Sequence, residues 1–156
     1  MTKTNAMRLI EQAGIEYRCT QYDYDENDLS GTTAATLIGM PAEQVFKTLV
    51  ARGSRNGIAV FCIPVCCSLD LKKATKVFSD KNMEMVTVKE LLPLTGYIRG
   101  GCSPVGMKRN YPMYIDEAAV LYDEIAISAG VRGQQIILNP SDLITYLSMT
   151  VCDLTQ

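Results

Sequence analysis

The chain has 156 residues, a length typical of one domain that can bury a hydrophobic core. Its residues are 47% hydrophobic and 21% charged, as in globular proteins, and no apolar run approaches the roughly 20 residues of a membrane-spanning helix. The net charge of −2 argues against a protein that coats long stretches of nucleic acid, but it allows contact with one short nucleic-acid end. We expect one domain over residues 1–156.

Histidine is absent from the sequence, which removes the commonest general base, the commonest zinc ligand and every Ser-His or Cys-His catalytic pair. The six cysteines lack metal-type C-x-x-C spacing and lie mostly in apolar surroundings, which favours buried reduced thiols over disulfides. The first residues lack the charged and then apolar layout of a secretory signal. These features predict a cytoplasmic protein.

The chain begins with a predicted helix and strand. Thr4 or Asn5 can cap a helix that Gly14 ends, and residues 15–22 then alternate as a strand with Tyr22 at its exit. Four acidic residues follow within six positions. They lack the glycine and the terminal glutamate of an EF-hand loop, so they fit a solvated loop better than a calcium site.

Four later helices have recognisable start signals. The predicted starts are Thr32 or Thr33, Ser68, Thr87 and Asn139. Gly39 stops the first of these helices, and Pro93 is expected to end the third. Lys72, Lys73 and Lys76 lie on one face of the second helix. They either contact phosphates or form an ordinary solvated surface.

Strand patterns recur between the helices. After the first strand they cover residues 45–51, 58–63, 83–86, 112–116, 124–128 and 134–138, with a short strand or an irregular tail from Val151. Helices are interspersed with hairpin connections rather than alternating regularly with strands. The sequence therefore predicts a single-domain α+β fold, with a mixed, mostly antiparallel sheet or a partly closed barrel surrounded by helices.

Lys47 is the only charge in the apolar segment 45–51 of the predicted central hairpin. A buried ammonium is unfavourable unless an anion lies near it, so its partner could be a ligand. The other interpretation is a lysine that reaches solvent from the strand end or pairs with a structural carboxylate. The position alone leaves both open.

A glycine-rich loop, Gly100-Gly101-Cys102-Ser103-Pro104-Val105-Gly106, precedes Lys108 and Arg109. Glycines let main-chain N–H groups approach a ligand closely, and Pro104 stiffens the second half of the loop. Such a loop could hold a developing oxyanion, or it could be a wide surface turn.

Four features, taken in their order and spacing, carry a family resemblance. They are Tyr22, Lys47 within Val45-Phe46-Lys47-Thr48-Leu49, the stretch from Thr95 to Gly106, and Ser128-Ala129-Gly130-Val131-Arg132-Gly133. Together they resemble the YbaK/EbsC family of Cys-tRNA(Pro) deacylases, relatives of the editing domain of bacterial prolyl-tRNA synthetase. The resemblance covers nearly the whole chain.

The resemblance implies the fold of this family and a trans-editing deacylase that hydrolyses the ester of mischarged Cys-tRNA(Pro). The thiol of the mischarged cysteine would attack its own ester carbonyl, which agrees with the lack of histidine. The implied partner is the 3′ CCA end of tRNA(Pro), and prolyl-tRNA synthetase is a further candidate. No membrane, DNA, metal or other cofactor is implied.

The family motifs also imply roles for residues. Lys47 would hold the terminal adenosine or its phosphate, while Gly100 and Gly101 would offer main-chain amides to the reacting carbonyl. The implied substrate-binding residues are Tyr22, Ser103, Ser128, Gly130, Arg132 and Gln135.

Two departures from the family pattern leave the amino-acid preference open. The family often has lysine where Val131 stands and aspartate where Gln135 stands. The alternative activity is deacylation of Ala-tRNA(Pro), or of another small aminoacyl-tRNA, by a bound water, and the alternative from another class is a non-catalytic adapter for tRNA or the synthetase. Cys102 could act as a nucleophile activated by Lys108 or Arg109, or it could serve packing alone.

Overall fold

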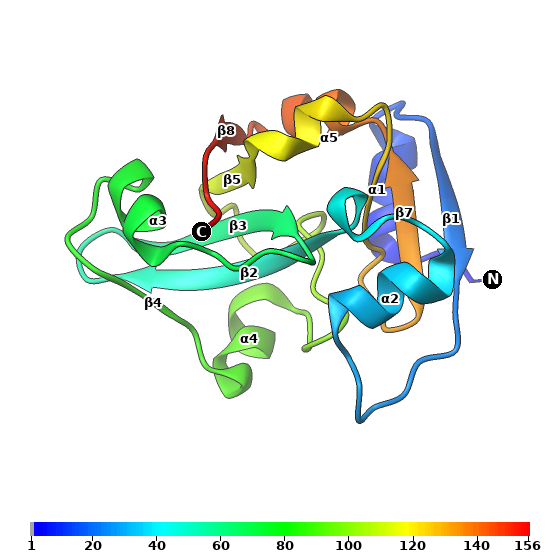
Figure 1. Cartoon of the computed structure of the whole chain (residues 1–156), viewed down its shortest axis with the longest axis horizontal. Helices are drawn as coiled ribbons and strands as arrows, with labels where there is room; N and C mark the ends of the chain where they lie inside the picture. The colour runs from blue at the N-terminus through cyan, green and yellow to red at the C-terminus, as the bar shows by residue number, and fades with distance from the viewer. Residues whose placement is uncertain (1) are drawn as a thin grey trace.

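The computed structural model describes residues 2–156 and confirms the α+β class (Figure 1). The helices are α1 (Asn5–Gln12), α2 (Gly31–Ile38), η1 (Ala42–Gln44), α3 (Leu71–Val77), α4 (Val88–Thr95), η2 (Glu117–Leu121) and α5 (Pro140–Leu147). The strands are β1 (Tyr17–Gln21), β2 (Phe46–Gly53), β3 (Gly57–Pro64), β4 (Met83–Met85), β5 (Met113–Asp116), β6 (Ile125–Ser128), β7 (Gln134–Leu138) and β8 (Thr150–Cys152). All the predicted strands occur, with small differences at their ends.

The strands form two sheets rather than a closed barrel. The larger sheet has the order β4-β2-β3-β5-β8, in which β3, β5 and β8 run parallel while β2 is antiparallel to β3 and to β4. The smaller sheet, β1-β7-β6, is antiparallel and runs steeply across the direction of β2 and β3 in Figure 1. A parallel bridge between Val45 and Ala126 joins the two sheets at the start of β2.

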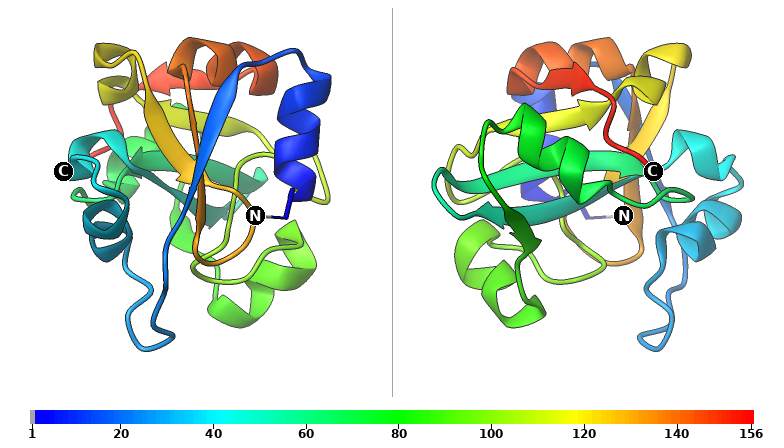
Figure 2. Two further views of the ribbon diagram at one scale, coloured as in Figure 1. Left: turned by 90° about the vertical axis from the view of Figure 1, so that its right-hand side faces the viewer. Right: turned by 60° about the vertical axis from the view of Figure 1, so that its left-hand side comes forward.

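The alternation of side chains along β2 supplies two hydrophobic clusters. Val50 packs into the main core with residues of β3, β6, β7, α1 and α5, whereas the adjacent Ala51 faces a second cluster under α3. The right view of Figure 2 shows α3 lying across this second face of the larger sheet. Both faces of the central hairpin are therefore covered, which explains its nearly continuous apolar sequence.

Helix starts are confirmed where a short polar side chain stands directly before the helix. The Thr4 hydroxyl accepts a hydrogen bond from the Met7 N–H in α1, and Asn139 caps α5. Thr87 and Glu90 form a reciprocal capping box at the start of α4. These contacts satisfy N–H groups that have no partner within the helix.

Two predicted helix starts are wrong by two or three residues. Ser30, rather than Thr32 or Thr33, caps α2, because its hydroxyl reaches the Thr33 N–H from an extended backbone. Ser68 does not cap α3, because the Asp70 carboxylate accepts from two N–H groups of the first turn at 2.9 and 3.1 Å. A carboxylate that accepts two N–H groups is the stronger cap.

Pro93 does not end α4, contrary to the sequence prediction. The helix continues to Thr95 and stops at Gly96, which adopts the left-handed conformation with φ of 87°. Proline removes only its own donor, and the later bond from the Gly96 N–H to the Leu92 carbonyl forms at 2.8 Å. The helix end is therefore set by the glycine.

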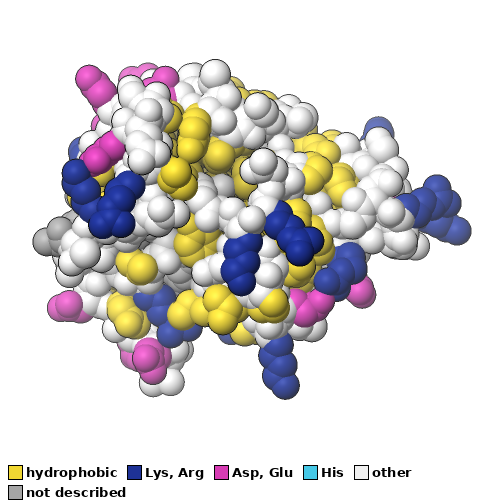
Figure 3. Space-filling view, turned by 180° about the vertical axis from the view of Figure 1, so that it is seen from behind, with side chains coloured by type: hydrophobic (Ala, Val, Ile, Leu, Met, Phe, Trp, Pro, Cys, Tyr) yellow, Lys and Arg dark blue, Asp and Glu magenta, His cyan; other side chains and the backbone are white. Residues whose placement is uncertain are grey.

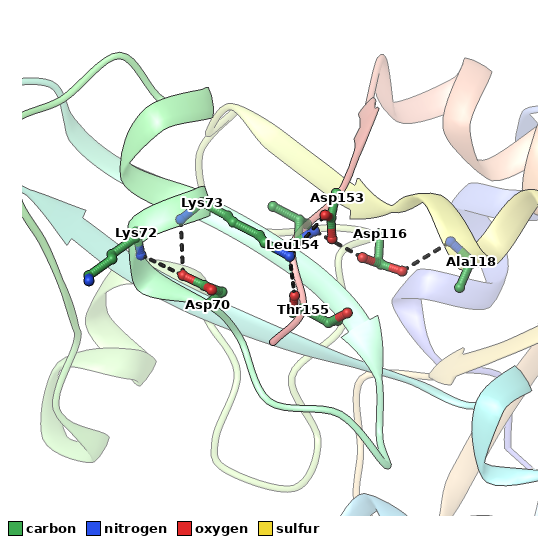
Figure 4. A network of polar contacts seen from close by, with 8 residues as sticks. All are labelled: Asp70, Lys72, Lys73, Asp116, Ala118, Asp153, Leu154 and Thr155. Atoms are coloured by element: carbon green, nitrogen blue, oxygen red, sulfur yellow. Dashed lines mark hydrogen bonds and ion pairs between the residues drawn. The ribbon is translucent and has the colours of Figure 1, made fainter.

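The end of the chain is fastened to the larger sheet and to α3 by polar contacts, of which those of Asp116 are buried (Figure 4). The Asp116 carboxylate, 4% exposed, accepts from the N–H groups of Leu154 and Ala118, each at 3.0 Å. Lys73 of α3 donates to Asp153 at 2.9 Å. Lys73 therefore has a structural role in fastening the end of the chain.

Glu90 ties α4 to the central hairpin. Its carboxylate accepts from Arg52 of β2 and from the Thr87 N–H and hydroxyl. The hydrogen bond from Arg52 is the main cause that lowers the pKa of Glu90 to about 2, with further contributions from Thr87.

No helix among residues 2–156 has the length and apolar character needed to cross a membrane.

We expect the contribution of Glu90 to stability to depend on pH. A lowered folded-state pKa stabilises the fold above the ordinary value of 4.5, and this contribution is lost as the pH falls towards about 2. Thermal unfolding followed by circular dichroism should therefore give a lower Tm for Glu90→Gln than for the unaltered protein at neutral pH. The difference should shrink through this acidic window, and a constant difference would contradict the assignment.

Candidate active site

A cavity of about 400 Å³ lies between α2, α4, one edge of β2 and the glycine-rich loop. Its lining comes from six parts of the chain: Tyr22, Leu29–Thr32 and Ala34, Val45–Val50 and Val65, Met85–Val88 and Leu91, Arg99, Gly100 and Cys102, and Ser128 and Gln135. The volume falls in the range of small-ligand sites. The cavity therefore collects residues from distant parts of the sequence into one concave site.

One wall of the cavity is an edge of β2 that lacks a neighbouring strand. β4 pairs with β2 only from Ala51 to Gly53, and the last contact on this side is the bond from the Val86 N–H to the Val50 carbonyl. Main-chain groups alternate in direction along a strand, so those of Thr48 also point away from β3. The strand thus presents main-chain polar groups beside Lys47.

Lys47 lies half-buried in this wall and forms no ion pair with any carboxylate of residues 2–156. The interpretation as a lysine paired with a structural carboxylate is therefore wrong. An ammonium held partly out of water beside a cavity attracts an anionic or strongly polar ligand. The geometry keeps Lys47 as the candidate for binding the ligand.

The glycine-rich loop lines the opposite part of the cavity through Gly100. This residue has φ of 87°, a conformation that side chains disfavour, and a Cβ here would lie 3.3 Å from Leu29. The Gly101 N–H is already used, because it donates to the Ile98 carbonyl at 3.0 Å. Gly101 instead permits a close approach, since its Cβ would lie 3.2 Å from the main chain of Val131 and Arg132.

Buried polar groups behind the loop hold it in place. Thr95 is fully buried. Its hydroxyl donates to the Leu91 carbonyl at 2.7 Å and accepts from the Tyr97 N–H at 3.1 Å. The Tyr97 hydroxyl donates to the Val105 carbonyl. A Cβ on Gly130 would lie 2.9 Å from the Tyr97 ring, so glycine is needed at that position.

Three predicted substrate-binding residues do meet in the cavity. Tyr22 is held by the bond from its N–H to the Gly133 carbonyl at 2.8 Å. Ser128 and Gln135 are cross-strand neighbours on β6 and β7, with exposed fractions of 8% and 6%. With Lys47 and Gly100 they form the group that the structure brings together.

The other predicted site residues lie outside the lining of this cavity. The Ser103 hydroxyl is fully buried and accepts from the Val105 N–H at 3.2 Å. Gly130 packs against Tyr97, and the Arg132 Nε donates to the Arg99 carbonyl at 2.9 Å. The contacts of these residues shape the loop around the site. A motif match cannot distinguish a residue with this role from one that contacts a ligand.

The charged side chains in the lining are those of Lys47 and Arg99, and no Asp or Glu contributes to it within the described residues. Sequence reasoning missed Arg99 together with Leu29, Thr48 and Leu91. Arg99 stands directly before the glycine pair, which was the available signal, whereas the apolar residues gave none. The lysines of α3 do not line the cavity, and no group of three metal-binding side chains forms within residues 2–156.

Cys102 lies in the cavity wall as a neutral thiol. Burial raises the pKa of Cys102 to about 12, and burial likewise raises the pKa of Cys62 to about 12. A thiol attacks as its thiolate, so a protonated Cys102 is a poor nucleophile. The structure favours the packing role for Cys102.

The sequence model of the family described as "Aminoacyl-tRNA editing domain" matches residues 29–146. The "Putative Cys-tRNA(Pro)/Cys-tRNA(Cys) deacylase EbsC" of Enterococcus faecalis is 42% identical over 153 residues, covering 98% of this chain and 93% of the relative. The uncharacterized protein YwhH of Bacillus subtilis is 27% identical over 80% of each chain.

The fold also matches solved structures. A crystal structure described as "a putative trans-editing enzyme for prolyl tRNA synthetase" has a TM-score of 0.86 and 26% identity, covering 100% of this chain and 99% of the other. The structure of hypothetical protein APE2540, at 20% identity, has a TM-score of 0.87 and covers 96% and 97% of the two chains. The second likeness concerns the fold alone.

The six cysteines should differ widely in their reactivity. At about pH 8, iodoacetamide should modify the exposed Cys19 and Cys66 first and Cys102 more than about a hundredfold more slowly, because the thiolate fraction falls as the pKa rises. Peptide mass spectrometry over time measures this order. Rapid labelling of Cys102 in the folded protein would restore it as a candidate nucleophile.

Proposed function

The chain belongs to the aminoacyl-tRNA editing domain family, and we propose that it clears mischarged Cys-tRNA(Pro) in trans, in the cytoplasm, by cleaving the aminoacyl ester. It is an aminoacyl-tRNA deacylase, an enzyme that acts on an ester. The identity of the amino acid and of the tRNA rests on the named relatives. The chemistry of the cavity supports the choice of cysteine.

The observation that carries this choice is a cavity with cations but without an effective nucleophile or general base of its own. Lys47 and Arg99 line it, no carboxylate of residues 2–156 does, the sequence has no histidine, and Cys102 is protonated. An ester is already activated towards attack. A substrate that carries its own thiol close to the carbonyl therefore supplies the missing nucleophile.

In the proposed reaction the substrate thiol loses its proton and its sulfur attacks the ester carbonyl. The C–O bond to the terminal ribose breaks, the ribose oxygen takes up a proton, and the amino acid leaves as a cyclic thioester. The chain's contribution is to hold the carbonyl and the sulfur together and to stabilise negative charge. Bound water then opens the cyclic thioester.

Lys47 and Gly100 have complementary parts in this scheme. The Lys47 ammonium binds the terminal adenosine or its phosphate, and the Gly100 N–H, free of partners within the described residues, donates to the developing oxyanion. Tyr22 and Ser128 line the space around the aminoacyl group. Gly101, whose N–H is engaged, acts by allowing the loop to pack closely.

The 3′ CCA end of the tRNA enters, in this proposal, past a surface rich in unpaired cations. The segment from residue 91 to residue 115 contains no acidic residue, and its exposed Lys108 and Arg109 form no ion pair with any described residue. Lys108 lies beside the end of α4, since its N–H donates to the Thr95 carbonyl at 3.0 Å. Figure 3 shows one face of the molecule, over which Lys and Arg side chains are spread, with acidic side chains beside several of them.

Lys47→Ala should reduce single-turnover deacylation of Cys-tRNA(Pro) by about a hundredfold or more, because a charge-assisted contact with the ligand is lost. Ala-tRNA(Pro) and Pro-tRNA(Pro) serve as parallel substrates, and Lys72→Ala on α3 is the matched control. Circular dichroism should report an intact fold. Faster loss of alanine than of cysteine would overturn the choice of substrate, and binding without turnover would indicate an adapter.

The double variant Lys108→Gln, Arg109→Gln should raise KM for Cys-tRNA(Pro) while leaving the cleavage of 2′(3′)-O-cysteinyl-adenosine unchanged. Each lost phosphate contact also lowers the slope of log KM against log salt concentration by about one. Neutralising Lys72 and Lys76 in the same way is the control. Equal effects on both substrates would contradict a role in binding the tRNA beyond its terminal nucleoside.

A further inference from the structure

Gln135 carries a buried side-chain amide oxygen that accepts no hydrogen bond within the described residues. The residue is 6% exposed, and its Oε1 is buried without any partner within the described residues. A buried carbonyl oxygen in this state destabilises the fold relative to a paired one. Since the residue also lines the cavity, the missing donor can come from a ligand.

The neighbours of Gln135 do not supply a hydrogen-bond donor to its amide oxygen. It lies at the centre of the smaller sheet, between Thr20 of β1 and Ser128 of β6. The Ser128 hydroxyl already accepts from the Gly130 N–H at 3.1 Å. Rotation about the last side-chain bond can turn the amide oxygen towards the cavity, because this torsion is broad and roughly two-fold.

We infer that Gln135 binds the α-amino group of the aminoacyl ester, a step that rests on the proposed function. Gln135 carries the one side-chain carbonyl in the lining, which contains no Asp, Glu or Asn among the described residues. The ester carbonyl and the ribose can accept hydrogen bonds from Lys47, Arg99 and the Gly100 N–H. The amino group is the donor that lies beside the ester carbonyl in the substrate, and Gln135 supplies a side-chain carbonyl oxygen that can accept from it.

This contact makes Gln135 a positioning residue for the thiol. When the amino group of the substrate is held at Gln135 and its carbonyl at Gly100, the direction in which the substrate's own thiol side chain leaves its α-carbon is fixed. The sulfur then stays near the carbonyl instead of sampling other rotamers, which raises its effective concentration. An amide does this without adding a negative charge, so it does not oppose the formation of the thiolate.

The test compares two esters of adenosine, cysteinyl-adenosine and 3-mercaptopropionyl-adenosine, which differ only in the amino group. Because the amino group also raises the intrinsic reactivity of the ester, the uncatalysed cleavage of both esters is measured in parallel. The unaltered enzyme should favour the cysteinyl ester in kcat/KM by at least about tenfold beyond the uncatalysed ratio, since one buried hydrogen bond distinguishes the two. In Gln135→Met, which keeps the length but not the polar atoms, the enzymatic ratio should fall to the uncatalysed one, with the loss confined to the cysteinyl ester.

Gln134→Met is the matched control. Its Oε1 is also buried without a partner, but the next residue on a strand faces the other side, and Gln134 does not line the cavity. This variant should keep the full preference for the cysteinyl ester. Equal loss on both esters in Gln135→Met would mean a packing role, and an unchanged ratio would mean no contact; either overturns the inference. Failure of the unaltered enzyme on Cys-tRNA(Pro) itself would overturn the proposed function and the inference with it.

Discussion

The site depends on the point where β4 stops pairing with β2. After the bond from the Val86 N–H to the Val50 carbonyl, the chain turns away into α4 instead of continuing along the strand. If β4 ran on, it would cover the edge from Phe46 to Leu49 and fill the cavity. The contacts of α4 with β2 through Glu90 and Arg52 then keep the space open by fixing the helix at its side.

The glycines around the cavity act mainly by allowing elements to approach. Gly101 lies against the main chain of the 129–133 turn, and Gly130 lies against the Tyr97 ring. Among these glycines, Gly100 lines the cavity itself. Two segments that are about thirty residues apart therefore close on each other only because side chains are missing at the contacts. The glycines of the family motif are therefore needed for this close packing as well as for the chemistry at the cavity.

The sequence predicted the elements well where local contacts decide them. The central hairpin, the capping box at Thr87 and the cap at Asn139 depend on neighbouring residues, and all three are confirmed. The sequence failed at Ser68, because Asp70 competes as a cap two residues later, and at Pro93, because a single missing donor does not end a helix.

The site was predictable only in part, for a physical reason. Lys47 was identifiable because a charge within an apolar strand needs an explanation, and the structure brings it to the cavity without an ion-pair partner among residues 2–156. Ser103 and Arg132 belong to the same motifs, yet they bond to main-chain groups of the loops. Spacing along the chain cannot separate a residue that touches the ligand from one that shapes the loop. That difference arises from long-range packing.

The charge of the cavity connects the absence of histidine with the choice of substrate. Within the part of the chain that the structure describes, the lining has two cations and no carboxylate. These charges disfavour a general base there, because a nearby positive charge lowers the proton affinity of any basic group. The same charges favour a thiolate and an oxyanion. A site of this kind is poorly suited to activating water with its own side chains. It is well suited to a substrate whose reacting groups both become negative, and among aminoacyl esters a cysteinyl ester meets that condition.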